Sequence, residues 1–235
     1  MDFDILHEDN HILVAVKPQN LPTQADSSGD ADFLSLLKDY LKQKYDKPGN
    51  VFLGLVHRLD RPTGGVMVFA KTSKAAERLC QAIREGDFEK EYLAVTVGCP
   101  KEPKAQLTHY LKKNPLTNVV SVVPLATEGA KRADLVYEVL ETKGRVSLLK
   151  VRLLSGRSHQ IRVQMAHIGC PVFGDVKYKG DIARGYPLAL WAEKLAFTHP
   201  VTKERMVFLA YPPEEKEPWK RFELSNHILI RRSEL

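Results

Sequence analysis

The feature of this sequence that most constrains its fold is a series of short segments rich in β-forming residues in the middle of the chain. Several of these segments are joined by short turns such as Lys143-Gly144. Strands that follow one another through tight turns pair in antiparallel fashion. The sequence therefore predicts a mainly antiparallel sheet, with strands at 88–97, 106–111, 119–123, 133–140 and 146–154.

The flanking parts of the chain add further strands and helices. Apolar residues recur at helical spacing after Asp32 and again after Ser73, which can each cap a helix, and Gly86 lies just past the second pattern. We expect strands at 5–6, 12–16, 51–55 and 66–70, and helices at 32–45, 73–83 and 159–168. No linker marks a domain boundary. The chain, 43% hydrophobic, is therefore expected to form one α+β domain over residues 1–235.

Composition argues against membrane, disulfide and metal-dependent classes. The first ten residues carry four acidic and no basic side chains, and no apolar run approaches the length that crosses a bilayer, which favours a cytoplasmic protein. The cysteines, Cys80, Cys99 and Cys170, are far apart and form no CxxC pair, which disfavours disulfides and zinc. His159 and His167 lack a third ligand at a known metal spacing, so no metal is expected.

Positive charge is concentrated in one region. The net charge is +6, and residues 101–162 contain twelve Lys and Arg against five Asp and Glu, a balance of +7 that leaves −1 for the remainder. Such a region suits a polyanion, because neutralising phosphates releases their counterions. A solvated face that keeps the protein soluble would have the same composition. Charge alone therefore leaves both interpretations open.

A polar segment, VHRLDRPTGG at 56–65, lies between two apolar strands. It brings His57, Arg58 and Asp60 to the ends of rigid elements, where enzymes often place ionisable groups. The alternative is a surface turn in which Asp60 pairs with Arg58 or Arg61. The segment by itself does not decide between an active site and a turn.

A second polar segment, LLSGRSHQIRVQMAHIG at 153–169, marks the change from a strand to a helix. Free backbone N–H groups from Gly156 onward, together with the Arg157 side chain, could bind a phosphate there. Arg162 is three residues after His159, so the two share a helix face. The alternative is a helix N-terminus whose Arg and His are merely solvated.

The strand at 88–97 contains Tyr92. An isolated tyrosine in such a strand is usually a core residue whose hydroxyl is hydrogen-bonded. Taken alone, Tyr92 therefore indicates packing rather than chemistry.

Together these segments resemble the RluA-type family of pseudouridine synthases in order and spacing. The stretch GLVHRLDRPTGGVMVFAKT at 54–72 is similar to the family signature, in which HRLD precedes a Thr-Ser-Gly-like tripeptide, an apolar strand and AKT. The stretches KEYLAV at 90–95 and SGRSHQIRVQMAHIGCPVFGD at 155–175 are similar to two further family motifs. ILHEDNHILVAVKP at 5–18 is similar to the start of the family's catalytic domain. The resemblance thus covers most of the chain.

The resemblance implies an isomerase that cuts the glycosidic bond of a uridine in RNA, rotates the base and joins its C5 to the same sugar carbon, without a cofactor. Asp60 matches the essential aspartate, which attacks the sugar or the base or abstracts a sugar proton. Arg162 matches the arginine paired with it, and a nearby guanidinium favours an ionised, oriented carboxylate. Tyr92 matches a tyrosine placed against the target base, and Arg58 a residue that enters the space left by the extruded uridine.

The resemblance also implies a partner and an architecture. Structured RNA, either ribosomal or transfer RNA, is expected to bind a central cleft in a mixed, mainly antiparallel sheet flanked by helices, and the protein is expected to be a monomer. Four more residues are expected near the RNA or the active-site loop: His57, Arg157, His159 and Gln160. Gly64 replaces the serine usual in the signature, which removes one hydroxyl from the loop. Because the resemblance begins by Ile5, no small S4-like RNA-binding domain is expected before the catalytic one.

Two other classes fit the sequence less well. A non-catalytic RNA-binding module would explain the basic region, but a degenerate relative is expected to have lost Asp60, Tyr92 or Arg162, and all three are present. A glycoside hydrolase ordinarily needs two carboxylates across the scissile bond. Only Asp60 has a motif around it, so the pseudouridine synthase is favoured.

Overall fold

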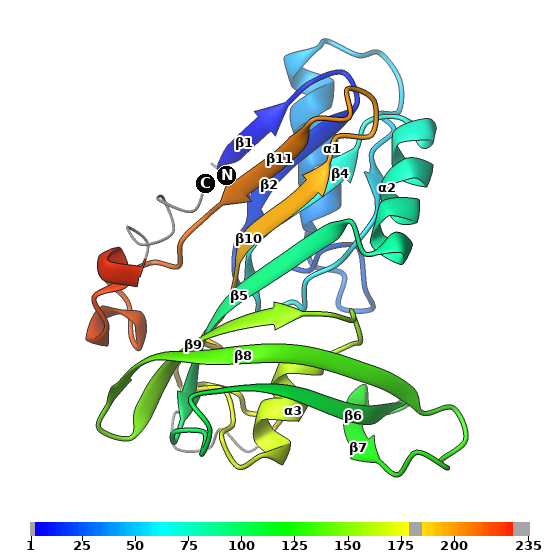
Figure 1. The fold of residues 1–235 in the computed structure, drawn as a ribbon. Helices are drawn as coiled ribbons and strands as arrows, with labels where there is room; N and C mark the ends of the chain where they lie inside the picture. Colours follow the sequence, from blue (N-terminus) through cyan, green and yellow to red (C-terminus); the bar gives the residue numbers. More distant parts are fainter. Residues whose placement is uncertain (1–2, 179–184, 228–235) are drawn as a thin grey trace. The chain divides into compact units, whose positions relative to one another are not determined.

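The structure is a computed structural model that describes residues 3–178 and 185–227 (Figure 1). Contacts divide the chain into two compact units. Unit 1 comprises Met1–Lys90 and Ala192–Ala210, and unit 2 comprises Glu91–Trp191 and Tyr211–Leu235. The single domain expected over residues 1–235 stays a prediction.

Unit 1 is a sheet with a helix on each face. Its strands follow the order β1-β2-β4-β10, with β3 paired to β4 and β11 paired to β10. The strands are β1 (Ile5–Glu8), β2 (Ile12–Lys17), β3 (Gly54–Leu55), β4 (Gly64–Ala70), β10 (Leu190–Thr198) and β11 (Arg205–Leu209), and the helices are α1 (Phe33–Lys44) and α2 (Ser73–Glu85).

The strand β4 is buried on both of its faces. Alternate side chains of a strand point to opposite sides of the sheet. On one side Val68 belongs to an apolar cluster with Leu79 of α2. On the other side Phe69 packs against Phe33 of α1, with ring centroids 5.7 Å apart. All seven residues of β4 are therefore buried, and the polar loop that precedes it is attached to a rigid element.

Both helices of unit 1 begin at a side-chain cap. Asp32 accepts a hydrogen bond from the first turn of α1. Thr72 accepts the Ala75 N–H at the start of α2, and Gly86, with φ 83°, ends that helix in the left-handed conformation. The predicted cap Ser73 is wrong by one residue, because Thr72 has the extended backbone of a cap and Ser73 is already helical.

In its described residues, 91–178, 185–191 and 211–227, unit 2 contains five paired strands, the helix α3 and the 3₁₀ turn η2. The strand order is β5-β9-β8-β6-β7, and the described pairs are antiparallel. The elements are β5 (Phe88–Val97), which begins in unit 1, β6 (Lys104–Asn114), β7 (Val119–Val123), β8 (Lys131–Lys143), β9 (Val146–Leu153), α3 (Gln160–His167) and η2 (Trp219–Arg221). The first six residues of α3 are all buried.

The predicted α+β class with a mainly antiparallel sheet is confirmed. The three predicted helices are present, and β5 and β7 have the predicted bounds. The strand predicted at 51–55 is wrong in length, because only Gly54–Leu55 pairs with β4. No element was predicted where β10 and β11 lie.

Candidate active site

The loop between β3 and β4 carries Asp60, and its backbone is held by an unbroken row of hydrogen bonds. The carbonyl oxygen of Asp60 accepts the Thr63 N–H at 2.9 Å, which closes a turn. Three side chains bind the neighbouring carbonyls: Thr23 Oγ1 donates to Leu59 O at 2.8 Å, Lys17 Nζ to Arg61 O at 3.2 Å and Gln19 Nε2 to Pro62 O at 3.1 Å. Four consecutive carbonyls are thus bonded, and the loop cannot shift without breaking several of these bonds.

Lys17, which no sequence motif singled out, supports the loop with a buried ammonium group. Its side chain is fully buried, and Nζ donates to the carbonyls of Pro18, Leu21 and Arg61 at 2.7–3.2 Å. Three carbonyls match the three donors of an ammonium group. Burial lowers the pKa of Lys17 to about 7, while the carboxylate of Asp60 acts to raise it. The sequence contains one indication of this burial, because Lys17 is the last residue of β2, whose other residues are all apolar.

His57 is turned toward the strand β4. Its Nε2 accepts the Val68 N–H at 3.1 Å, and its ring lies 5.5 Å from that of Phe88 in an edge-to-face arrangement. Burial, and then the nearby ammonium of Lys90, lower the pKa of His57 to about 3. The imidazole is therefore neutral near pH 7, and it fastens the start of the loop to the sheet.

The two arginines of the loop differ in their surroundings. Arg58 is exposed. Arg61 donates hydrogen bonds to Ser28 and Asp30, so its guanidinium is directed at the segment before α1. Arg61 thus has carboxylate and hydroxyl partners well away in sequence, and Arg58 presents its side chain to solvent.

Arg162, in unit 2, is held by a buried carboxylate. Its Nε donates to Asp175 Oδ2 at 2.7 Å and its Nη2 to Asp175 Oδ1 at 2.8 Å. The Tyr178 ring covers the guanidinium, with Arg162 Cζ 5.2 Å from the ring centroid. The predicted pairing of Arg162 with Asp60 joins residues of different units and stays a prediction.

His159 and Gln160 lie at the start of α3 and have different partners. His159 adopts a left-handed backbone, φ 52°, and its Nδ1 is 2.7 Å from the Tyr178 hydroxyl. Gln160 is buried: its Oε1 accepts from Ser155 Oγ and the Arg157 N–H, and its Nε2 donates to Asp134 O. The expectation of a free backbone N–H at Arg157 is therefore wrong, because this N–H donates a hydrogen bond to the buried Gln160 Oε1.

The Arg157 side chain lies on the surface. Its Nε donates to the carbonyl of Arg132 on β8 at 3.0 Å. Two exposed guanidinium groups therefore lie close to the turn before α3.

Tyr92 lies in the centre of β5, opposite Val151 of β9. Its side chain is 7% exposed, so the prediction of a largely buried strand tyrosine is confirmed. Its placement against a target base stays a prediction.

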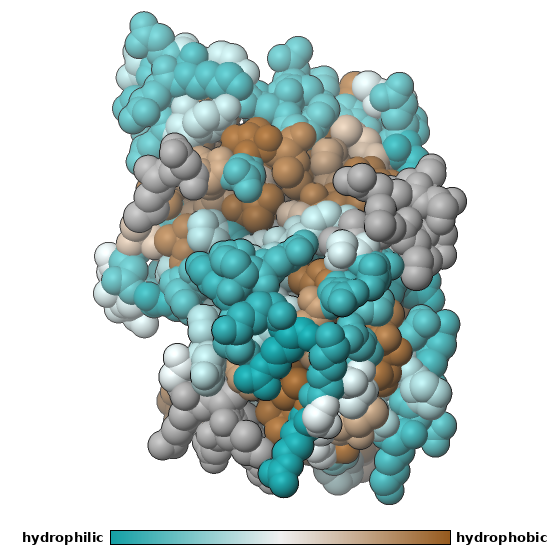
Figure 2. Space-filling view, turned by 90° about the vertical axis from the view of Figure 1, so that its left-hand side faces the viewer, coloured by the Kyte–Doolittle hydropathy of each residue, from teal (hydrophilic) through white to brown (hydrophobic). Residues whose placement is uncertain are grey.

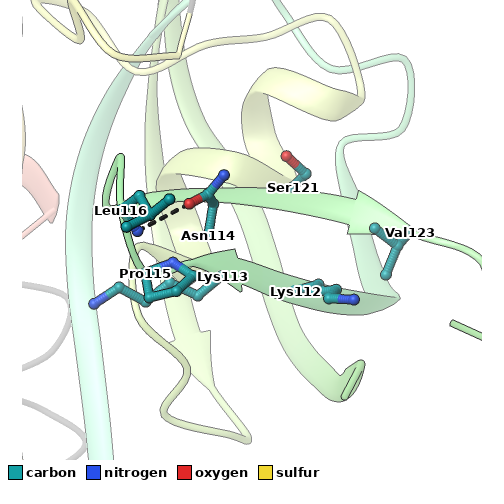
Figure 3. A pocket seen from close by; sticks show the side chains of 7 residues that line it. All are labelled: Lys112, Lys113, Asn114, Pro115, Leu116, Ser121 and Val123. Carbon is teal, nitrogen blue, oxygen red and sulfur yellow. Dashed lines mark hydrogen bonds between the residues drawn. The ribbon is translucent and has the colours of Figure 1, made fainter. Parts of the chain in front are cut away.

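The β6–β7 hairpin presents a basic surface with an apolar tip (Figure 3). A cavity of about 360 Å³ lies along it, with Lys112 and Lys113 in its lining. Asn114 Oδ1 accepts the Leu116 N–H at 2.9 Å, which shapes the turn, and the Leu116 side chain is 94% exposed. Figure 2 shows that apolar side chains gather in patches on the face that it presents, with hydrophilic side chains around them. The hairpin offers positive charge and apolar contact together.

The described part of the chain contains neither a candidate metal site nor a candidate membrane-spanning helix. Within residues 3–178 and 185–227, no three His, Cys, Asp or Glu side chains gather as a metal site requires. No helix over the same residues is both long and apolar enough to span a membrane.

Comparison with known proteins identifies the class to which this fold and these motifs belong. A family model described as RNA pseudouridylate synthase matches residues 11–167. The fold is similar to that of the human RNA Pseudouridylate Synthase Domain Containing 4, with a TM-score of 0.74, 24% identity and coverage of 89% of this chain and 88% of that one. The chain belongs to the RNA pseudouridylate synthase family, and it is an isomerase that acts on RNA.

Individual relatives are similar over most of the chain. Ribosomal large subunit pseudouridine synthase D of Yersinia pestis is 34% identical, over 90% of this chain and 68% of that protein. The uncharacterized RNA pseudouridine synthase YhcT of Bacillus subtilis is 33% identical, over 92% of this chain and 70% of that protein. The resemblance found in the sequence motifs is thereby confirmed at the level of the family.

Proposed function

We propose that this enzyme converts uridines of ribosomal RNA into pseudouridines, with Asp60 as the nucleophile. The RNA class is supported by the relatives named ribosomal large subunit pseudouridine synthase D, one of which is 34% identical over 90% of this chain. Transfer RNA is the competing substrate, and the experiment below distinguishes the two.

The observation that carries the role of Asp60 is the row of four bonded carbonyls around it, from Leu59 to Pro62. A nucleophile must be held close to its productive geometry before substrate binds, because a misplacement of about 1 Å can cost a hundredfold in rate. A simple surface turn needs no such support from a buried lysine. The arrangement is what a pre-positioned carboxylate requires.

The reaction balances without an external reagent. The bond from the sugar C1′ to the base N1 breaks, the base turns, a bond from C1′ to C5 forms, and the proton at C5 is lost while N1 gains one. Asp60 attacks the sugar or the base, or takes a sugar proton, and in each case it acts as a carboxylate. Arg162 is proposed to pair with it, since its bond to Asp175 uses one edge of a guanidinium that has five N–H donors.

The aromatic and basic residues have separate proposed roles. The Tyr92 ring lies against the target base, and its hydroxyl transfers a proton. Arg58, which is exposed, fills the space left by the flipped uridine and stacks on its neighbours. Arg157 and His159 contact the RNA backbone. His57 and Gln160 have their polar atoms bonded within the chain, and we assign them to shaping the loop and the turn.

The first test replaces Asp60 by Asn, which is nearly isosteric but a far poorer nucleophile and base. We expect loss of tritium release from RNA labelled at the uridine C5, with RNA affinity and melting temperature close to those of the wild type. Asp39→Asn, at an exposed position of α1, is the matched control and should keep full activity. Turnover within about tenfold of the wild type, a difference of only about 1.4 kcal/mol in the barrier, would show that Asp60 is not the nucleophile.

The second test names the substrate. Pseudouridines are mapped in ribosomal and transfer RNA from cells with and without the gene. We expect sites that disappear from ribosomal RNA and return on expression of the wild type but not of Asp60→Asn. Loss confined to transfer RNA would overturn the ribosomal assignment while leaving the enzyme class intact.

A further inference from the structure

Asp175 is fully buried, and its carboxylate accepts four hydrogen bonds. Two come from the Arg162 guanidinium, at 2.7 and 2.8 Å, and two from the backbone N–H groups of Lys177 and Tyr178, at 3.0 and 3.2 Å. A buried carboxylate is costly unless its oxygens are satisfied in this way. The geometry leaves the carboxylate only one orientation in which all four bonds form.

The backbone that carries Asp175 is itself confined. Gly174 has φ 77°, and a side chain there would come within 2.3 Å of the Pro187 carbonyl oxygen. Only glycine fits this close approach between two backbone segments. The position of the carboxylate is therefore set by the chain path and not by a flexible loop.

The Tyr178 ring packs against the Arg162 guanidinium, and its hydroxyl group is held by two further contacts. The Tyr178 hydroxyl accepts the Val120 N–H of β7 at 2.8 Å and lies 2.7 Å from His159 Nδ1. Its ring centroid is 5.2 Å from Arg162 Cζ. The guanidinium is thus bound at one edge by a carboxylate and faced by a ring, although a free arginine side chain has much rotamer freedom.

We propose that Asp175 is a positioning residue for the reaction: it holds the Arg162 guanidinium in the orientation that binds the catalytic carboxylate. This inference rests on the proposed function, in which Arg162 pairs with Asp60. A guanidinium has five N–H donors, and Asp175 accepts hydrogen bonds from two nitrogens on one of its edges. This bidentate contact fixes the plane of the guanidinium and thereby sets the direction of its other N–H donors. The alternative is that Asp175 only stabilises the fold of unit 2.

The test is a double-mutant cycle on turnover. Asp175→Asn and Asp175→Ser each remove the charge but keep an oxygen that can accept the Lys177 and Tyr178 N–H groups. Each is measured in the wild type and in Arg162→Met, which keeps the chain length without the charge. Glu141→Gln, which weakens an ion pair with Lys143 in the same unit, is the control. Circular dichroism and melting curves establish that each variant is folded at the assay temperature.

We expect both Asp175 variants to lower kcat at least tenfold, with KM for RNA within threefold and Glu141→Gln unchanged. In the Arg162→Met background the same changes should have almost no further effect, because Asp175 acts through Arg162. A folded Asp175 variant with wild-type kcat, or an equal further loss in the Arg162→Met background, would overturn the inference. If Arg162→Met alone keeps wild-type kcat, Arg162 has no catalytic role, and the inference about Asp175 fails with it. Asp60→Asn tests the nucleophile separately from this outcome.

Discussion

A carboxylate that acts as a nucleophile must be oriented and reachable, and the residues around Asp60, the proposed nucleophile, bear on both requirements. Asp60 is half-buried, and the Lys17 ammonium is among the charges that interact with it. Tyr92 is more deeply buried, so its ring is held by the strand β5. Side chains that are held in this way do not need to be ordered during the reaction. Enzymes reduce the entropic part of a barrier by such pre-positioning.

We predict that Tyr92→Phe keeps RNA affinity and lowers turnover. The substitution retains the ring, which is proposed to stack on the base, and removes only the hydroxyl, which is proposed to transfer a proton, a role typically worth about 10²–10⁴-fold. The measurement is kcat from C5 tritium release together with a binding titration. Tyr110→Phe, on β6, removes a hydroxyl from a residue with no proposed catalytic role and serves as the control. Unchanged turnover in Tyr92→Phe would reduce Tyr92 to a packing role.

The elements explain why these residues are placed as they are. The loop with Asp60 is bonded to the end of β2 through Lys17 and to the segment after β2 through Thr23, so two parts of unit 1 support one loop. The helix α3, which carries Arg162, follows a turn shaped by Gln160. In both cases a buried polar side chain binds backbone carbonyls or N–H groups that secondary structure leaves unpaired.

We predict a pH-dependent difference in stability between the wild type and Lys17→Met. The Lys17 pKa is about 7 in the folded chain, against an ordinary value of 10.5. Between these values the unfolded chain binds more protons than the folded one, so the stability of the wild type rises with pH relative to Lys17→Met, by at most about 1.4 kcal/mol per pH unit. Urea unfolding at pH 6.5 and pH 9 measures this. A constant difference across that range would show that Lys17 stays charged.

Much of the fold could be predicted at this scale, because β-forming runs and turn residues are local signals. The helix α2 and the strands β5 and β7 follow from such signals. The strand β10 was missed because its sequence LWAEKLAFT places Glu193 and Lys194 in the middle of an apolar run, and Glu193 is buried by tertiary contacts. The motif residues could be named from resemblance, but the partners Lys17 and Asp175 depend on contacts between segments distant in sequence.

In the whole molecule, charge is divided unevenly. The +7 balance of residues 101–162 falls entirely within unit 2, and the rest of the chain carries −1. The β6–β7 hairpin contributes Lys112 and Lys113 to this excess, and both are exposed. Electrostatic attraction of RNA is therefore expected to depend mainly on unit 2.

We predict that RNA affinity falls steeply with salt and that the hairpin accounts for part of the slope. Each phosphate contact contributes about 0.7 to 0.9 to the slope of log K against log salt concentration. The double variant Lys112→Ala/Lys113→Ala should reduce the slope by about 1.4 to 1.8 if both residues contact phosphates. The control, Lys38→Ala/Lys47→Ala, changes two lysines of unit 1 outside the basic region. A flat salt dependence of the wild type would mean that the basic region is only a solvated face.

Unit 1 is built from two separate stretches of chain, because β10 and β11 join strands that were made more than a hundred residues earlier. On a translating ribosome, the first ninety residues therefore emerge without the strands that complete their sheet, and their apolar core stays open until residue 210 has left the exit tunnel. Residues 91–191 emerge meanwhile, and they include the hairpins β6–β7 and β8–β9, whose pairings are local in sequence. The segment that carries Asp60 is thus synthesised well before the strands that complete its sheet.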